Sequence, residues 1–103
     1  MDTEPGVDED YQDFLDRYVF GDVWCRDGLD LRTRSCVTVA MLTAMGRISQ
    51  LRNHLRAAPG NGVTIDELKE IIFHSAVYCG VALAADAFKA LDEVIADLHP
   101  RDS

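Results

Sequence analysis

The chain has 103 residues, of which 48% are hydrophobic and 27% charged, and its formal net charge at pH 7 is −8. This composition indicates one compact domain and excludes a disordered or fibrous protein, and the modest core expected at this length favours self-association. The net charge comes from residues 1–30, which hold ten acidic and two basic side chains, whereas residues 31–103 hold eight of each. The acidic balance argues against nucleic-acid binding, which needs clustered Lys and Arg.

The sequence predicts neither a membrane partner nor an oxidising compartment. Its most apolar run, residues 37–45, is shorter than the roughly 18 to 20 apolar residues that cross a bilayer, and its first residues lack the pattern of a signal peptide. The cysteines Cys25, Cys36 and Cys79 have no spacing typical of zinc or of a dithiol pair. We therefore expect free, mostly buried thiols in a reducing cytoplasm, with no metal site.

Apolar residues recur with helical spacing along the chain, and no segment alternates as a strand does. The expected fold is all-α, with about five helices. Residues 1–9 are expected to be a flexible acidic N-terminus, residues 10–98 a single helical domain, and residues 99–103 a short tail. The first helix is expected to begin at Asp10, and a loop should follow over residues 25–30.

Four further helices are predicted after this loop. The second, residues 31–45, is apolar nearly all round after Ser35 and should be a buried central helix that ends at Gly46. The third is expected at about residues 48–58. The fourth has a clear start, because Thr64 and Glu67 fit a capping box. Its expected buried stripe is Leu68, Ile71, Ile72, Ser75, Ala76 and Cys79, and the inward positions of the last helix, about 83–98, are Ala84, Ala87, Phe88, Leu91, Ile95 and Leu98.

Two polar groups could do chemistry. His54 lies between arginines on the third helix, and imidazole has the one side-chain pKa, about 6.5, that suits proton transfer near neutrality. On the fourth helix, Glu67, Glu70 and His74 stand at i, i+3 and i+7 and share one face. Each group has an ordinary interpretation as well, a structural histidine or a solvated helix face. A metal bound by Glu70, His74 and His54 is a weaker alternative without a ligand motif.

Arginines form the third candidate group. Five of them, at positions 32, 34, 47, 52 and 56, occupy a stretch from Leu31 to Ile65 that has no acidic residue. They could pair with acids elsewhere in the fold, or bind a ligand carboxylate, since the guanidinium fork matches that geometry. Tyr78, one turn beyond His74, could face the same cavity or simply pack.

Five ordered segments are similar to the carboxymuconolactone decarboxylase family, from about Tyr11 to Val94. They are residues 21–24 (GDVW), 28–35 (GLDLRTRS), 54–58 (HLRAA), 61–64 (NGVT) and 77–81 (VYCGV). The resemblance implies the helical fold of the alkylhydroperoxidase D-like type and a homo-oligomer, a trimer or commonly a hexamer with active sites at or near subunit contacts. It also implies a cytoplasmic enzyme of aromatic-compound catabolism.

The resemblance implies a decarboxylase and argues against the redox branch of the superfamily. Alkylhydroperoxidase D needs a C-x-x-C pair followed by a histidine, and at the corresponding positions this chain has Arg47 and Gln50 before His54. Without a thiol pair, peroxide reduction by that route has no nucleophile and no resolving partner.

By resemblance, the function implied is a cofactor-independent decarboxylation of a small anionic lactone. His54 would transfer a proton and Glu70 would orient or share it. Arg32 or Arg34 would bind a substrate carboxylate or stabilise the ring oxygen. The substrate would also contact His74 and Tyr78. The candidate site therefore consists of His54, Glu70, Arg32, Arg34, His74 and Tyr78.

Several positions depart from the family pattern. Ala82 and Ala85 replace a usual proline and asparagine, Gly60 replaces a frequent arginine, and His74 replaces a glutamine. These changes leave two alternatives open. One is another cofactor-free isomerisation, cyclisation or dehydration in specialised metabolism, and the other is a non-catalytic oligomeric binding protein.

Overall fold

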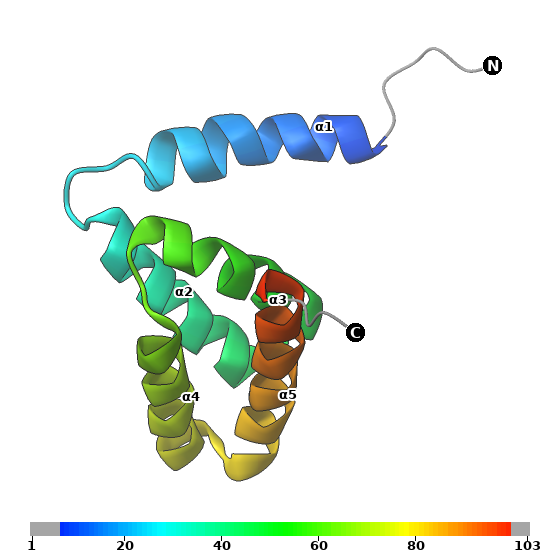
Figure 1. The fold of residues 1–103 in the computed structure, drawn as a ribbon. Coiled ribbons are helices and arrows are strands. Elements are labelled where there is room, and N and C mark those ends of the chain that lie inside the picture. The colour runs from blue at the N-terminus through cyan, green and yellow to red at the C-terminus, as the bar shows by residue number, and fades with distance from the viewer. Residues whose placement is uncertain (1–6, 100–103) are drawn as a thin grey trace. The chain divides into compact units, whose positions relative to one another are not determined.

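The computed structural model describes residues 7–99, which are helical with short connections and contain no strand (Figure 1). The all-α prediction is confirmed. The chain divides into two compact units at Asp30 and Leu31. No helix among residues 7–99 has both the length and the apolar character that a membrane span needs. The predicted extents of the flexible N-terminus and of the tail fall in part on residues 1–6 and 100–103, outside the described residues.

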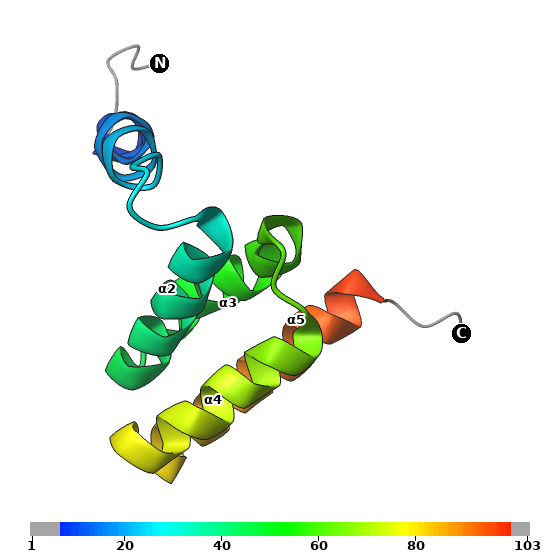
Figure 2. The same ribbon diagram turned by 90° about the vertical axis from the view of Figure 1, so that its left-hand side faces the viewer.

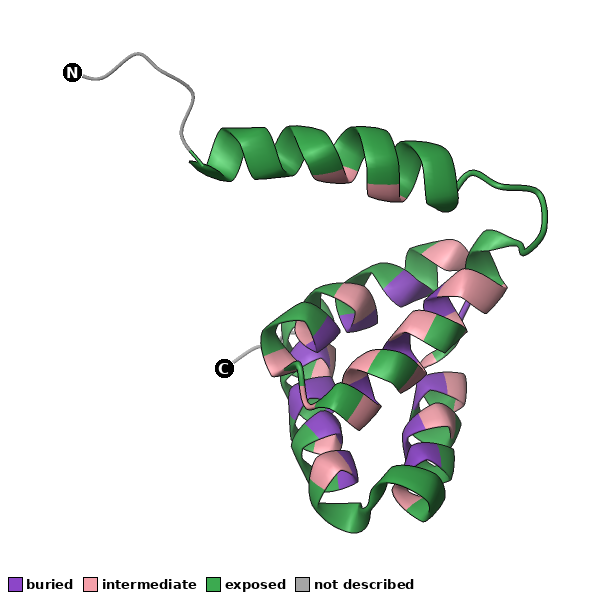
Figure 3. Cartoon of the chain, turned by 180° about the vertical axis from the view of Figure 1, so that it is seen from behind, coloured by how far each residue is buried: buried purple, intermediate pink, exposed green. Residues whose placement is uncertain are grey.

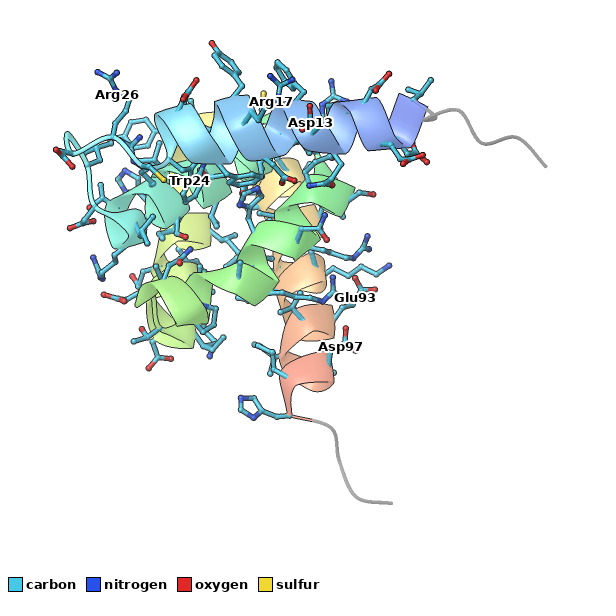
Figure 4. The ribbon with its side chains drawn as sticks, turned by 90° about the horizontal axis from the view of Figure 1, so that it is seen from above. Asp13, Arg17, Trp24, Arg26, Glu93 and Asp97 are labelled. Atoms are coloured by element: carbon cyan, nitrogen blue, oxygen red, sulfur yellow. The ribbon has the colours of Figure 1, made fainter. Side chains whose placement is uncertain are left out.

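The first unit is one continuous helical rod. Helix α1 (Val7–Phe14) passes into the π-helical segment η1 (Leu15–Val23), so the helix begins at Val7 rather than at Asp10. Along it, the rings of Phe14 and Tyr18 lie 5.3 Å apart. Arg17 pairs with Asp13 one turn earlier, and Figure 4 shows both side chains on the rod. No residue of α1 or η1 is buried.

The second unit consists of four α-helices and one short 3-10 turn. They are α2 (Leu31–Met45), α3 (Ile48–Ala57), η2 (Ala58–Asn61), α4 (Ile65–Cys79) and α5 (Val81–Leu98). Helices α4 and α5 form an antiparallel hairpin, and α2 packs against α3, α4 and α5 (Figure 2). The start of α4 confirms the predicted capping box: the hydroxyl of Thr64 accepts from the backbone N–H of Glu67, and the Glu67 carboxylate accepts from that of Thr64.

The buried residues lie on the sides of the helices that face one another in this unit (Figure 3). The core consists of Val39, Leu51, Leu55, Ala58, Val63, Leu68, Ile72, Ala84, Ala87, Ala90, Leu91 and Val94. Gly46 closes α2 with a φ of +69°, and a Cβ there would lie 3.2 Å from Cδ2 of Leu83, so the turn favours glycine on both counts.

Three burial predictions are wrong. Helix α2 is not buried all round: only Ser35, Val39 and Thr43 are buried, whereas Val37, Met41 and Met45 are exposed. The thiols are not mostly buried, because Cys25 and Cys79 are exposed and Cys36 is half-buried. On α5, Leu98 is exposed, while Ala90 and Val94 are buried without having been predicted. Periodicity marks apolar positions, but a neighbouring helix must reach a position to bury it.

Ion pairs join α3 to α5. Arg52 pairs with Glu93 and Arg56 with Asp97, each at 2.9 Å, and Figure 4 shows the two acids one turn apart on α5. These two arginines therefore serve the packing of the fold.

Removal of the cap tests how α4 is held. We expect Thr64→Ala to lower the unfolding free energy by about 1 kcal/mol, because the backbone N–H of Glu67 loses the hydroxyl that accepts from it. For a domain of this size the melting temperature should fall by roughly 4–8 °C. Thr64→Ser keeps the hydroxyl and serves as the control in thermal denaturation. Equal melting temperatures for all three proteins would contradict the role of the cap.

Candidate active site

A pocket with a volume of about 360 Å³, here named the hollow, lies between α2 and α4. Its walls are mostly apolar. They comprise Cys36, Val37 and Ala40 from α2, with Glu70, Ile71, His74 and Ser75 from α4. This volume is at the low end of the range of small-molecule sites, about 300–1,000 Å³, so the hollow suits a small ligand.

Helix α4 brings Glu70 and His74 to this hollow because they stand four residues apart on one face. The imidazole of His74 also lies against the ring of Tyr78, with centroids 5.1 Å apart. Tyr78 is 77% exposed and is not among the lining residues. The Ser75 hydroxyl donates to the carbonyl of Ile71, 2.8 Å away, and so is satisfied within the helix.

Arg32 is the candidate arginine on the side of α2 that carries the hollow. It precedes Cys36 by four residues, hence by about one helical turn, whereas Arg34 is turned roughly 200° around the helix from it. Nη2 of Arg32 donates to Oε2 of Glu67, which itself precedes Ile71 by one turn on α4. The backbone N–H of Thr64 and, next, the Arg32 guanidinium lower the pKa of Glu67 from its usual range. Glu67 therefore remains a carboxylate around neutral pH.

His54 lies on α3 and is half-buried. Burial lowers the pKa of its imidazole from the ordinary value of 6.5, since desolvation disfavours the charged ring. The structure does not place His54 among the residues that line the hollow with Glu70 and His74. The proton-transfer residue predicted from sequence and the two polar groups of the hollow are thus on different parts of the protomer.

A second polar contact near α2 escaped the sequence analysis. Nδ2 of Asn61 donates to Oγ of the buried Ser35 over 2.8 Å and so ties η2 to α2. The one sequence signal for it is a serine at the start of the mostly apolar part of α2. Cys36 was likewise not predicted as a lining residue, because its wall forms only when α4 packs beside α2. Among residues 7–99, no three His, Cys, Asp or Glu side chains are grouped to hold a metal ion.

An all-α protein with an imidazole and a carboxylate in a small apolar hollow is suited to moving a proton on a small substrate. The sequence pattern of the carboxymuconolactone decarboxylase family matches residues 9–93, and the chain belongs to this family. A 4-carboxymuconolactone decarboxylase from Acinetobacter baylyi is 49% identical over 90 residues, which cover 87% of this chain and 67% of that protein.

Two further relatives are more distant. A nitrosuccinic acid decarboxylase from Metarhizium robertsii is 34% identical over 93% of this chain and 64% of its own length. An uncharacterised 15.0 kDa protein from Paracoccus denitrificans is 32% identical over 76% of this chain and 60% of its own length. The chain thus spans about two thirds or less of the relatives that it matches. The named activities of the first two support the prediction of a carboxy-lyase.

The lowered pKa of His54 predicts a pH dependence of stability. The unfolded chain binds a proton at this imidazole near pH 6.5, whereas the folded chain binds it only at lower pH, so protonation favours unfolding. The unfolding free energy should therefore fall as the pH drops through 6.5 and on through the folded pKa. Urea denaturation of His54→Gln between pH 7.5 and 5.5 should show a shallower decline than the unmodified protein. Identical declines would contradict the assigned burial effect.

Proposed function

We propose that the protein is a cofactor-independent decarboxylase that acts on a small anionic lactone of the 4-carboxymuconolactone type. The observation that carries this proposal is 49% identity, over 87% of the chain, to a protein of that name. The setting would be a reducing cytoplasm and the catabolism of aromatic compounds. The three free cysteines accord with a reducing compartment.

The proposed reaction requires three catalytic contributions from the protein. Loss of CO₂ from such a lactone pushes an electron pair into the unsaturated ring and leaves a delocalised oxyanion, which is then protonated on carbon. The substrate carboxylates must be held, the lactone carbonyl oxygen must meet a donor as it gains charge, and a proton must be delivered to carbon. Protein side chains can make all three contributions, and none of the three requires a metal.

The positions of three residues suit these contributions: Arg32, Glu70 and His74. Arg32 stands one turn from the hollow and would bind a carboxylate, while Arg34 is the alternative that the rotation around α2 disfavours. Glu70 and His74 line the hollow, where they would orient the lactone and share a proton. Tyr78 would contact the substrate beside the His74 ring, which it already touches.

His54 keeps the role of principal proton carrier in this proposal. Its lowered pKa leaves the imidazole neutral around pH 7, so that it can accept a proton or donate an N–H without a prior change of charge. Because His54 does not line the hollow, its role depends on how the site is completed in the assembled enzyme.

Steady-state kinetics of CO₂ release from 4-carboxymuconolactone test these roles. We expect the unmodified protein to turn over the lactone in the presence of a chelator, and His54→Ala to lower kcat by about 10²- to 10⁴-fold, the usual contribution of a general acid or base. Arg32→Ala should mainly raise KM, because it removes a contact to a carboxylate.

His74→Gln is the matched control, because glutamine keeps a polar side chain at the position and removes the imidazole. Full turnover by His54→Ala together with loss in His74→Gln would transfer the proton-carrying role to His74. No CO₂ release by the unmodified protein would refute the proposed function.

A homo-oligomer, a trimer or hexamer, is part of the proposal. The outer side of α2 presents the exposed residues Val37, Met41 and Met45, and α4 presents Phe73 and Val77 near its end. Val37 also lines the hollow, so a second copy that covers this apolar surface would close the site from water. Self-association supplies the burial that the protomer lacks.

Replacement of an exposed methionine tests the oligomer. Met41→Lys should reduce the mass measured by light scattering toward the 11.4 kDa of one chain, because a charge in an apolar contact is costly. Lys89→Met, at an exposed position on α5, is the reverse control and should leave the assembly unchanged. A monomeric unmodified protein would contradict this part of the proposal.

A second candidate function is decarboxylation of an acyclic dicarboxylic acid. It is favoured by the similarity to a nitrosuccinic acid decarboxylase and by the presence of His74 on the wall of the hollow. A nitro group can take up the electron pair as a lactone does. A higher kcat/KM for nitrosuccinic acid than for 4-carboxymuconolactone would select this function.

A further inference from the structure

Arg32 and Glu67 form an ion pair at one end of the hollow between α2 and α4. Both residues lie in the first turn of their helices, and the next turn of each helix supplies Cys36 and Ile71 to the walls. The two helices therefore run with their N-terminal ends together, and the pair marks the N-terminal end of the hollow. Among residues 7–99, Glu67 is the one acidic residue that forms an ion pair with Arg32.

Glu67 is itself firmly held. Its Oε1 accepts from the backbone N–H of Thr64 at 2.9 Å, and its own backbone N–H donates to the Thr64 hydroxyl at 3.0 Å. The carboxylate thus has one oxygen in the cap of α4 and the other on Arg32. A flexible arginine is thereby tied to a rigid helix start.

We propose that Glu67 is a positioning residue, which holds the Arg32 guanidinium at the end of the hollow so that its remaining N–H groups can bind the carboxylate of a lactone. The bond to Glu67 engages Nη2 of a guanidinium that has five N–H donors in a planar fork, and a ligand can use the others. This inference rests on the proposed function in one respect, the anionic lactone as ligand.

The negative charge of Glu67 also opposes a second carboxylate, so the two effects must be weighed. The side chains of Arg32 and Glu67 are 46% and 41% exposed, and water at such a site screens repulsion between charges. Water does not weaken the benefit of a fixed guanidinium in the same way. Without Glu67, the Arg32 side chain would adopt many rotamers, and a ligand would have to restrict them on binding. Loss of Glu67 should therefore weaken binding of a carboxylate.

Two variants separate the ion pair from the helix cap. Glu67→Gln removes the charge but keeps a capping side chain, since Gln serves at this position of a capping box. Thr64→Ala removes the cap hydroxyl and leaves the Arg32–Glu67 pair in place. Both are made in the full chain, and their thermal melting is measured beside their binding.

Isothermal titration calorimetry with 5-oxotetrahydrofuran-2-carboxylate, a saturated lactone that carries one carboxylate, provides the measurement. We expect Glu67→Gln to raise the Kd about five- to tenfold and Arg32→Ala to raise it at least as much, whereas Thr64→Ala should leave the Kd unchanged although it melts earlier. The methyl ester of the probe should bind the unmodified protein and Glu67→Gln alike.

Three results would overturn the inference: equal or tighter binding by Glu67→Gln, equal weakening by Thr64→Ala, or no binding of the probe by the unmodified protein. If Glu67→Gln does not fold, Glu67→Asp carries the test, because it keeps charge and cap while it draws the carboxylate back from Arg32, and weaker binding is again expected. Binding that follows this pattern without CO₂ release from 4-carboxymuconolactone would refute the proposed function and leave the inference standing.

Discussion

The hollow exists because α2 and α4 are held side by side from their first turns. Thr64 fixes where α4 begins, and Glu67 joins that helix start to Arg32 on α2. From this end the walls follow by helix geometry, since each further turn brings one residue of α2 opposite one of α4. Core residues such as Val39 and Ile72 then keep the two helices in contact. One ion pair between the first turns of α2 and α4 thus joins the two walls of the hollow at one end.

The sequence predicted the helices well where a local signal marks their ends. Thr64 and Gly46 are such signals, because a cap or a left-handed turn depends on a few neighbouring residues. Burial was predicted less well. Val37 and Met41 are as apolar as core residues, and Cys79 continues the buried stripe of α4, yet all three are exposed because no other helix of the second unit covers them. An apolar side chain favours burial, but it is buried only where another surface packs against it. Periodicity in the sequence does not reveal where that surface lies.

The candidate site shows the same division. Glu70 and His74 could be predicted to share a face because i and i+4 positions are neighbours on any helix. The participation of Cys36 and the bond from Asn61 to Ser35 could not be predicted, since both depend on how separate helices pack. The absence of His54 from the lining of the hollow could not be predicted either, for the same reason. Family resemblance implies a role for His54, whereas the packing of one protomer brings Glu70 and His74 to the hollow.

The acid-free run of arginines illustrates why position must accompany charge in assigning a ligand site. Arg52 and Arg56 meet Glu93 and Asp97 of α5, and Arg32 meets Glu67 of α4, so three members of the run are halves of ion pairs whose other halves come later in the chain. The arginines of this stretch and the acidic residues later in the chain are therefore separated in the sequence but largely paired in the fold. What distinguishes Arg32 is that its pair lies one helical turn before residues that line the hollow, whereas the other two pairs link α3 to α5, which contribute no lining residue. The same guanidinium–carboxylate bond stabilises packing in one place and, beside a small apolar hollow, prepares a cation to meet a ligand.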